Sequence, residues 1–166
     1  MQVIGARAAM ERLVLAALLG LAPIAAGAVD LSRAQATLPE QNLVVITHDG
    51  KGHLFHVEMA TTADQQEIGL MWRKSLAADH GMMFVWPMPQ VSTMWMKNTL
   101  IPLDMLFVAS DGTVAAIDED AVPHSLAIIS SGVPVLATIE LQGGITEALD
   151  IRVGDKVDQQ LFGTGK

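Results

Sequence analysis

Apolar residues beyond residue 42 come in short runs that are separated by turn residues such as Gly, Pro, Asp and Asn. Some runs alternate apolar and polar side chains, which is typical of strands with one buried face, and others are continuously apolar, as in strands covered on both faces. The pattern predicts strands over residues 43–47, 53–60, 81–86, 93–97, 103–109, 113–118, 126–129, 133–141 and 156–161.

Two short helices are expected between these strands. Thr62 and Gln65 fit a capping box ahead of a helix at residues 64–68, and residues 143–149 can form one or two helical turns. Strands this short and this regularly spaced predict a mainly β (β-rich α+β) domain, residues 43–166: a compact, mostly antiparallel β-sandwich or barrel with two short helices. Residues 29–42 are polar and lack a clear period, so they are interpreted as a linker.

The first 28 residues have the three-part form of a secretory signal peptide. Two arginines precede an apolar run at residues 13–24, and the small residues Ala26 and Ala28 follow it. The run is shorter than the roughly 20 residues that a membrane-spanning helix needs. We expect cleavage after Ala28, a periplasmic or secreted protein, and no membrane association afterwards. Cleavage after Ala36 and an uncleaved anchor are the alternatives.

Charge and composition exclude several classes of function. The 166 residues carry a net charge of −8 without a cluster of Lys and Arg, which makes nucleic acid and anionic lipid poor partners. The chain has no cysteine, so it has no disulfide, thiolate metal site, cysteine nucleophile or lipoprotein anchor. It also lacks a Gly-x-Ser-x-Gly elbow, a phosphate loop and a dinucleotide fingerprint.

One predicted strand carries a single charge, Asp104, with apolar residues on both faces. A buried carboxylate needs hydrogen-bond donors or a cation, or it must take up a proton. We expect Asp104 to accept hydrogen bonds from the preceding turn, which holds Lys97, Asn98 and Thr99, or to pair with Lys97 or Arg73. Asp104 then either shapes this turn or acts as a base or ligand anchor beside a pocket.

Glu140 raises the same question, because it shares a strand face with Leu136 and Thr138. Lys97 or Arg73 could neutralise one of the two acids. The Lys97–Asn98–Thr99 tripeptide also places several donors in one turn, which suits an anion or a carbonyl-bearing ligand as well as ordinary turn chemistry.

Eight methionines lie beyond the expected cleavage site. Thioether sulfur selects Cu(I), so a copper site is one hypothesis, and the alternative is that methionine fills gaps in the core and packs on Trp rings. His48, His53 and His56 are close in sequence, but His53 and His56 point to opposite strand faces, and we expect surface histidines and no metal site or cofactor.

Several separate motifs resemble the family known as domain of unknown function 192, over roughly residues 54–157. The matching residues are Gly69, Leu70, Met71, Arg73, Gly81, Met82, Trp95, Met96, Lys97, Asn98, Thr99, Pro102, Leu103, Asp104, Glu140, Gly154 and Asp155. The chain departs from the motif at Met94, where phenylalanine is common, and at Met83, where leucine is common. The resemblance implies an exported, uncharacterised bacterial domain and assigns no reaction.

Three functions are compatible with these residues. The first is a binding or accessory module, with an unknown small molecule or protein as its partner and a polar pocket in an apolar wall that includes Met71 and Trp72 or Trp86. The second is a hydrolase-like enzyme with Asp104 or Glu140 as general base, and the third is a Cu(I)-binding protein. The candidate ligand-binding residues are Arg73, Trp95, Met96, Lys97, Asn98, Thr99, Asp104 and Glu140.

Overall fold

Seven strands form one curled sheet, and the computed structural model describes residues 28–164 of the chain. The strand order is β5–β4–β6–β3–β2–β1–β7, and every neighbouring pair is antiparallel except β2 and β3. The expected signal peptide, except for Ala28, lies outside the described residues. The strands are β1 (Glu40–Ile46), β2 (Gly52–Ala60), β3 (His80–Met94), β4 (Leu103–Val108), β5 (Val114–Ala121), β6 (Ile129–Gln142) and β7 (Lys156–Asp158).

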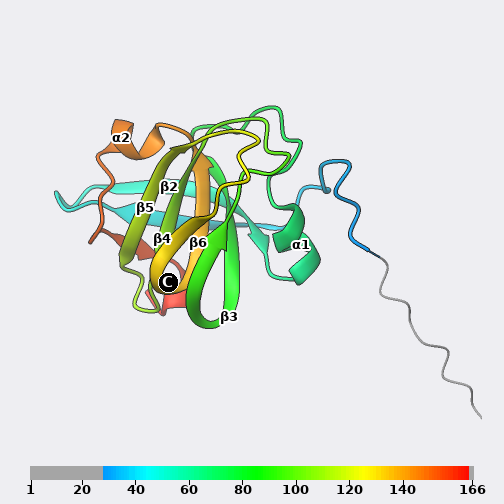
Figure 1. The fold of residues 1–166 in the computed structure, drawn as a ribbon. Coiled ribbons are helices and arrows are strands. Elements are labelled where there is room, and N and C mark those ends of the chain that lie inside the picture. Colours follow the sequence, from blue (N-terminus) through cyan, green and yellow to red (C-terminus); the bar gives the residue numbers. More distant parts are fainter. Residues whose placement is uncertain (1–27, 165–166) are drawn as a thin grey trace, which may run out of the picture.

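Two short helices lie near opposite ends of the sheet (Figure 1). Helix α1 (Ala63–Ile68) lies in the connection between the parallel strands β2 and β3, and α2 (Ile145–Leu149) follows β6. Thr62 and Gln65 form the expected capping box at the start of α1. The predicted mainly β, mostly antiparallel domain with two short helices is therefore confirmed.

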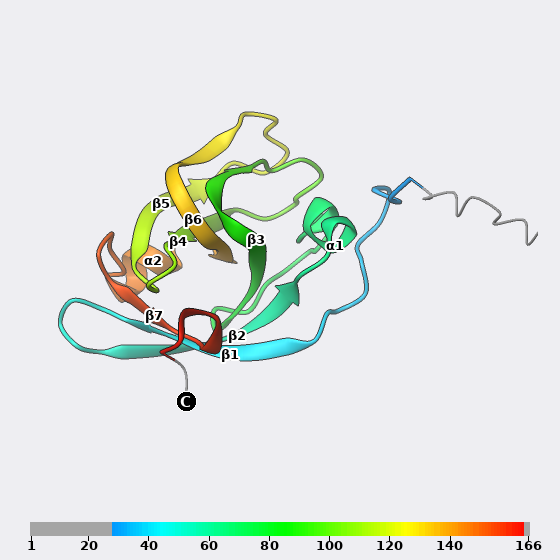
Figure 2. The same ribbon diagram turned by 90° about the horizontal axis from the view of Figure 1, so that it is seen from below.

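The sheet curls until its two edge strands meet at one end, as Figure 2 shows from below. Thr113 bridges to Lys156, and the amide of Val157 donates to the carbonyl of Gly112 at 2.7 Å. Of the two architectures that the sequence left open, the structure has a barrel-like one.

Strand β3 is longer than the sequence predicted. Residues 81–86 and 93–97 were expected to form two strands, because Pro87 and Pro89 lie between them. The structure has one bent strand of 15 residues instead. The pairing of β3 with β6 shifts register between Val85 and Gln90, and proline is tolerated where the ladder is already interrupted.

The two faces of the sheet bury two separate apolar clusters. The inner cluster includes Phe55, Met83 and Ile139, and the outer cluster includes Phe84, Met96 and Met105. Leu70, from the segment after α1, packs in the outer cluster. Buried side chains therefore cover β4 on both sides, which explains its continuously apolar sequence.

The two ends of the domain differ from the predicted boundaries. Strand β1 begins at Glu40 rather than at residue 43, and the strand expected at residues 156–161 is the shorter β7 followed by a 3₁₀ helix, Gln160–Phe162. Residues interpreted as a linker contact the domain: the carbonyl of Pro39 accepts a hydrogen bond from the amide of Met59. No helix in residues 28–164 is both long and apolar enough to span a membrane.

Candidate functional site

A row of four side chains crosses the outer face of the sheet and contains two carboxylates. Met82 of β3 lies opposite Glu140 of β6 and beside Glu58 of β2, and Glu140 lies opposite Met105 of β4. Residues opposite each other in a sheet point to the same face. Glu140 and Glu58 are therefore two strands apart, with Met82 between them.

Glu140 is buried without a partner. Its side chain is 4 % exposed, and Oε2 has no hydrogen-bond partner. Burial raises the pKa of Glu140 from its ordinary value of 4.5 to about 8. At neutral pH the carboxyl group is therefore mostly protonated and can donate a hydrogen bond.

A small pocket of about 80 Å³ lies over this carboxyl group. Met71 and Phe84 form part of its apolar wall, and Trp86 and Lys97 line it as well. The indole Nε1 of Trp86 is buried and, like Glu140, has no hydrogen-bond partner. The Trp86 ring stacks on Phe84 with 6.3 Å between the ring centroids, which fixes its orientation.

Lys97 is the cationic residue in the lining of this pocket. It lines the pocket, and its Nζ lies over the Trp95 ring at 4.8 Å from the centroid, in a cation–π contact. Among the described residues Lys97 has no ion-pair partner. Its three donors are therefore available to a ligand beside Trp95.

Asp104 points to the other face of the sheet. It lies opposite Leu141, which belongs to the inner cluster, whereas the next residue, Met105, lies opposite Glu140. The Asp104 side chain is 0 % exposed. The expected grouping of Asp104 and Glu140 in one pocket is therefore wrong, because successive residues of a strand point to opposite faces.

Four hydrogen bonds satisfy the Asp104 carboxylate. The backbone amides of Asp120 and Gly144 donate to Oδ1 at 2.9 and 3.0 Å. The amide and the hydroxyl of Thr146 donate to Oδ2 at 2.8 and 2.7 Å. Asp104 thus holds the end of β5 and the start of α2 together.

The expected partners of Asp104 are therefore wrong. Its donors come from residues 120, 144 and 146 and not from the Lys97–Asn98–Thr99 turn. Burial and the neighbouring Asp104 carboxylate also raise the pKa of Asp118. An acid that is fully bonded and closed to solvent fixes geometry and has no access to a ligand.

Arg73 pairs with Glu58 instead of with Asp104 or Glu140. The distance between Arg73 Nη2 and Glu58 Oε2 is 2.9 Å, and the side chains are 22 % and 8 % exposed. The same oxygen accepts a hydrogen bond from the amide of Leu38 at 2.7 Å. This ion pair therefore fastens the segment before β1 and the segment after α1 to the sheet.

Asn98 and Met96 have structural roles beside the pocket. Asn98 has a positive φ of 57°, and its Nδ2 donates to the carbonyl of Leu31 at 3.2 Å. The indole of Trp72 donates to the same carbonyl at 2.8 Å. Met96 is 0 % exposed and belongs to the outer cluster. The N-terminal segment is thus held against the motif residues, near α1 in Figure 1.

Most of the methionines serve as core residues. Those with at most 9 % exposure are Met71, Met82, Met83, Met94, Met96 and Met105. Met83 lies in the inner cluster, whereas Met82 and Met96 lie in the outer one. Met94 and Met105 also lie in the outer cluster, and the burial of these side chains among apolar neighbours supports packing over copper binding. In residues 28–164 no three His, Asp or Glu side chains are grouped to hold a metal ion.

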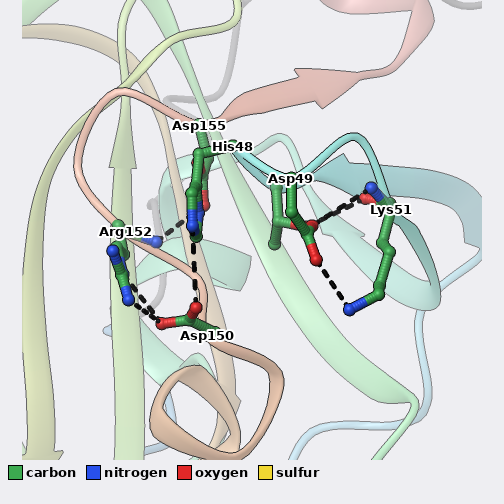
Figure 3. Close-up of polar contacts among 7 residues, drawn as sticks. His48, Asp49, Lys51, Asp150, Arg152 and Asp155 are labelled. Carbon is green, nitrogen blue, oxygen red and sulfur yellow. Dashed lines mark hydrogen bonds and ion pairs between the residues drawn. The ribbon is translucent and has the colours of Figure 1, made fainter.

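A second polar cluster surrounds the turn between β1 and β2, shown in Figure 3. Arg152 holds Asp150 with Nη2 at 2.7 Å from Oδ1, and His48 Nε2 lies 3.7 Å from Asp150 Oδ2. Asp155 accepts a hydrogen bond from the amide of Arg152 at 2.7 Å. Asp155 therefore shapes the turn that brings β7 to the edge of β5, and the cluster has a structural explanation.

The pocket thus gathers half of the predicted site residues: Trp95, Lys97, Thr99 and Glu140. Arg73, Met96, Asn98 and Asp104 support the surrounding structure. Sequence reasoning missed Glu58, Gly144 and Thr146 as partners. The Gly143–Gly144 pair was a usable signal, because Gly144 adopts a left-handed conformation with φ of 81° that presents its amide to Asp104.

The comparisons with known proteins agree with these motifs. The DUF192 model, described as "Uncharacterized ACR, COG1430", matches residues 44–159. A solved structure described as a proposed transcription regulator from Sinorhizobium meliloti 1021 is 43% identical, with a TM-score of 0.74, covering 77% of this chain and 99% of that chain. A protein of unknown function from Novosphingobium aromaticivorans DSM 12444 is 38% identical, with a TM-score of 0.71, covering 74% of this chain and 86% of that chain.

No curated protein matches the chain. The solved structures cover most of this chain, and the family model spans the sheet from β1 to the residue after β7. The same region holds Glu140, Lys97 and Trp86, which line the pocket. This chain belongs to the DUF192 family.

Proposed function

We propose that this domain is an exported small-ligand-binding module and that the pocket over Glu140 is its site. The observation that carries the proposal is the pair of buried, unpartnered groups in one pocket, Glu140 Oε2 and Trp86 Nε1. Buried polar side chains nearly always have a hydrogen-bond partner, and a buried donor or acceptor without one costs about 1–3 kcal/mol of stability. A ligand that bonds these two groups would remove that cost.

The surroundings of Glu140 support a binding role over a structural one. Asp104, the other acid on a central strand, has four donors, which shows how this fold satisfies a carboxylate that only fixes geometry. Glu58, in the same row, has Arg73 and the amide of Leu38. Glu140 differs from both of these acids, and it shares its pocket with a second unpartnered group, Trp86 Nε1. Buried groups of this kind concentrate at functional sites.

A titration of the ¹⁵N-labelled protein with small fragments tests this function. The panel contains acids, amides, alcohols and amines of three to six non-hydrogen atoms. At least one class should shift the indole N–H resonance of Trp86, because a ligand gives this donor an acceptor. The Trp72 indole is the internal control, since it already donates to Leu31. If no class moves Trp86, or if Glu140→Met leaves the shift unchanged, this pocket is not the binding site.

Acid–base catalysis is the second candidate, and the raised pKa of Glu140, about 8 in a pocket, favours it. The role would belong to Glu140 alone, since Asp104 is fully bonded and closed to solvent. Turnover of a bound ligand that is lost in Glu140→Gln, while binding is kept, would distinguish an enzyme from a binding module.

Export to the periplasm or the outside of the cell is part of the proposal. It rests on the leader at residues 1–28, which we expect to be removed after Ala28. The intact mass of protein recovered from the periplasm should correspond to a chain that begins at Val29. A mass that retains Met1 would contradict export by this leader, and a chain that begins at Thr37 would move the cleavage site.

A further inference from the structure

We propose that the ligand group recognised in this pocket is a carboxylate carried on a short apolar chain. This inference rests on the binding function proposed above for the same pocket and names the chemical class of its ligand. Three properties of the pocket indicate this class: the free polar groups of its lining, the protonation of Glu140, and the room that these groups surround.

The free polar groups of the lining are mainly donors. The indole N–H of Trp86 can only donate, and the ammonium group of Lys97 has three donors and no acceptor. Gln66 Nε2 is already engaged, because it donates to the carbonyls of Ala60 and Val85 at 3.1 and 2.8 Å. The carboxylate of Glu67 also lines the pocket, but Glu67 is exposed to solvent. A ligand that satisfies Trp86 and Lys97 must therefore present acceptors.

Glu140 adds a donor when its carboxyl group is protonated, and a neutral carboxyl donates a strong hydrogen bond to a carboxylate. The charged groups that line the pocket are Lys97 and Glu67 of α1. On the two strands beside β6, the residues opposite Glu140 are the uncharged Met82 and Met105. Glu58, two strands away, already pairs with Arg73 at 2.9 Å. Burial alone therefore controls the protonation of Glu140.

The volume and the apolar wall of the pocket limit the chain that carries the carboxylate. A volume of about 80 Å³ is several times the roughly 10–15 Å³ that one water needs, so the pocket has room for a molecule of only a few non-hydrogen atoms, such as a short-chain carboxylate. Met71 and Phe84 provide an apolar wall for the chain. The pocket reaches the surface at Trp95, which is 42% exposed, so a longer molecule could enter by its end. A free short-chain acid and the C-terminal carboxylate of a peptide share this chemistry.

An organic cation fits the same groups less well. It would satisfy an ionised Glu140, but it would leave the Trp86 donor unpaired and would be repelled by the half-buried Lys97. The opposite charge of Glu67 compensates little, because Glu67 is exposed and its charge is screened by solvent. The two ligand classes also have opposite pH dependence. A carboxylate needs Glu140 protonated and so binds better below the pKa of about 8, whereas a cation needs Glu140 ionised and binds better above it.

The test compares three molecules of nearly equal shape: propionate, propionamide and propylamine. Binding is followed by the Trp86 indole N–H resonance, with the Trp72 indole as the control, at pH 6.5 and pH 9.0. We expect propionate to bind more tightly than propionamide and to lose about tenfold in affinity between the two pH values, since one pH unit above the pKa deprotonates about nine-tenths of Glu140. Acetyl-Ala-Ala with a free C-terminus, compared with its C-terminal amide, distinguishes a peptide end from a free acid.

Substitutions separate the roles of the pocket residues. Glu140→Gln keeps a donor at the same place, so propionate should still bind but without the pH dependence. Lys97→Met should weaken propionate binding about tenfold, whereas Lys74→Met, an exposed lysine outside the pocket, should leave it unchanged.

Three outcomes overturn the inference. If propylamine binds best, more tightly at pH 9.0 and not at all in Glu140→Gln, the ligand is a cation and only the binding function stands. If propionamide binds as tightly as propionate, the charge has no role and the ligand is neutral. If none of the three molecules moves the Trp86 resonance and the wider fragment panel also fails, the binding function falls with the ligand class.

Discussion

Glu140→Met should stabilise the domain, although it alters a buried residue of a central strand. The side chain would join Met82 and Met105 on the outer face and remove an unpartnered carboxyl group. We expect the free energy of unfolding to rise by about 1–3 kcal/mol at pH 5.5, because that is the typical cost of an unsatisfied buried polar group. Chemical denaturation of the wild type and the variant measures the difference.

The difference should grow as the pH rises. The pKa of Glu140 is about 8 in the folded protein against an ordinary value of 4.5, so between these values the folded state keeps a proton that the unfolded state has released. Stability therefore falls with rising pH across this window, by up to about 1.4 kcal/mol per pH unit, and levels off above it. The Met variant lacks this slope.

Glu140→Gln is the matched control, because it removes the charge and keeps a polar group of the same shape. It should lose the pH dependence without gaining the stability at pH 5.5. A Met variant that is less stable than the wild type at every pH would mean that Glu140 has partners after all, and the pocket would lose its main support. A stabilising change at a buried acid is the expected mark of a residue kept for function.

The alternation of side chains along single strands predicted much of this fold. It identified Asp104 and Glu140 as buried carboxylates, and both are at most 4% exposed. It was wrong about Leu136, which was expected on the same face as Glu140 but packs against the inner cluster. Alternation assigns faces only within a strand, however. Whether Asp104 and Glu140 share a face depends on the register between β4 and β6, which is set by long-range packing.

The polar partners were harder to predict for the same reason. Local reasoning linked Asp104 to the turn just before it, but its donors include Gly144 and Thr146, which are 40 and 42 residues away in the chain. Arg73 pairs with Glu58, on a strand that precedes it by 15 residues. Short-range signals such as the capping box at Thr62 were reliable because all their atoms lie within one turn.

Asp104→Ala should be among the most damaging single changes to this domain. It would leave three backbone amides without their acceptor at a fully buried position, and the Thr146 hydroxyl would keep only Glu119 Oε1, at 3.3 Å. Each unmade buried bond costs about 1–3 kcal/mol, but these costs are not additive, so we expect a total loss of about 3–5 kcal/mol. Urea denaturation measures this loss, with the dependence of the unfolding free energy on urea concentration held equal for the wild type and the variant.

Asp104→Asn should cost nearly as much as Asp104→Ala. Both oxygens of the carboxylate accept hydrogen bonds, so the amide nitrogen of asparagine must face donors on one side. If the Asn variant were much more stable than the Ala variant, the hydrogen bonds to one of the two oxygens, Oδ1 or Oδ2, would contribute little to stability. The comparison therefore tests whether the carboxylate is needed as a double acceptor.

A double-mutant cycle identifies the partner of Asp104. Thr146→Val removes only the hydroxyl that donates to Oδ2 at 2.7 Å, and we expect it to couple to Asp104→Ala by about 1–2 kcal/mol. The same cycle with Lys97→Met is the control and should give a coupling near zero, because Lys97 lines the pocket on the outer face, whereas Asp104 points inward. A coupling to Lys97 larger than the coupling to Thr146 would contradict this division of the two acids between opposite faces. Such a result would indicate that Asp104 interacts with the residues of the pocket.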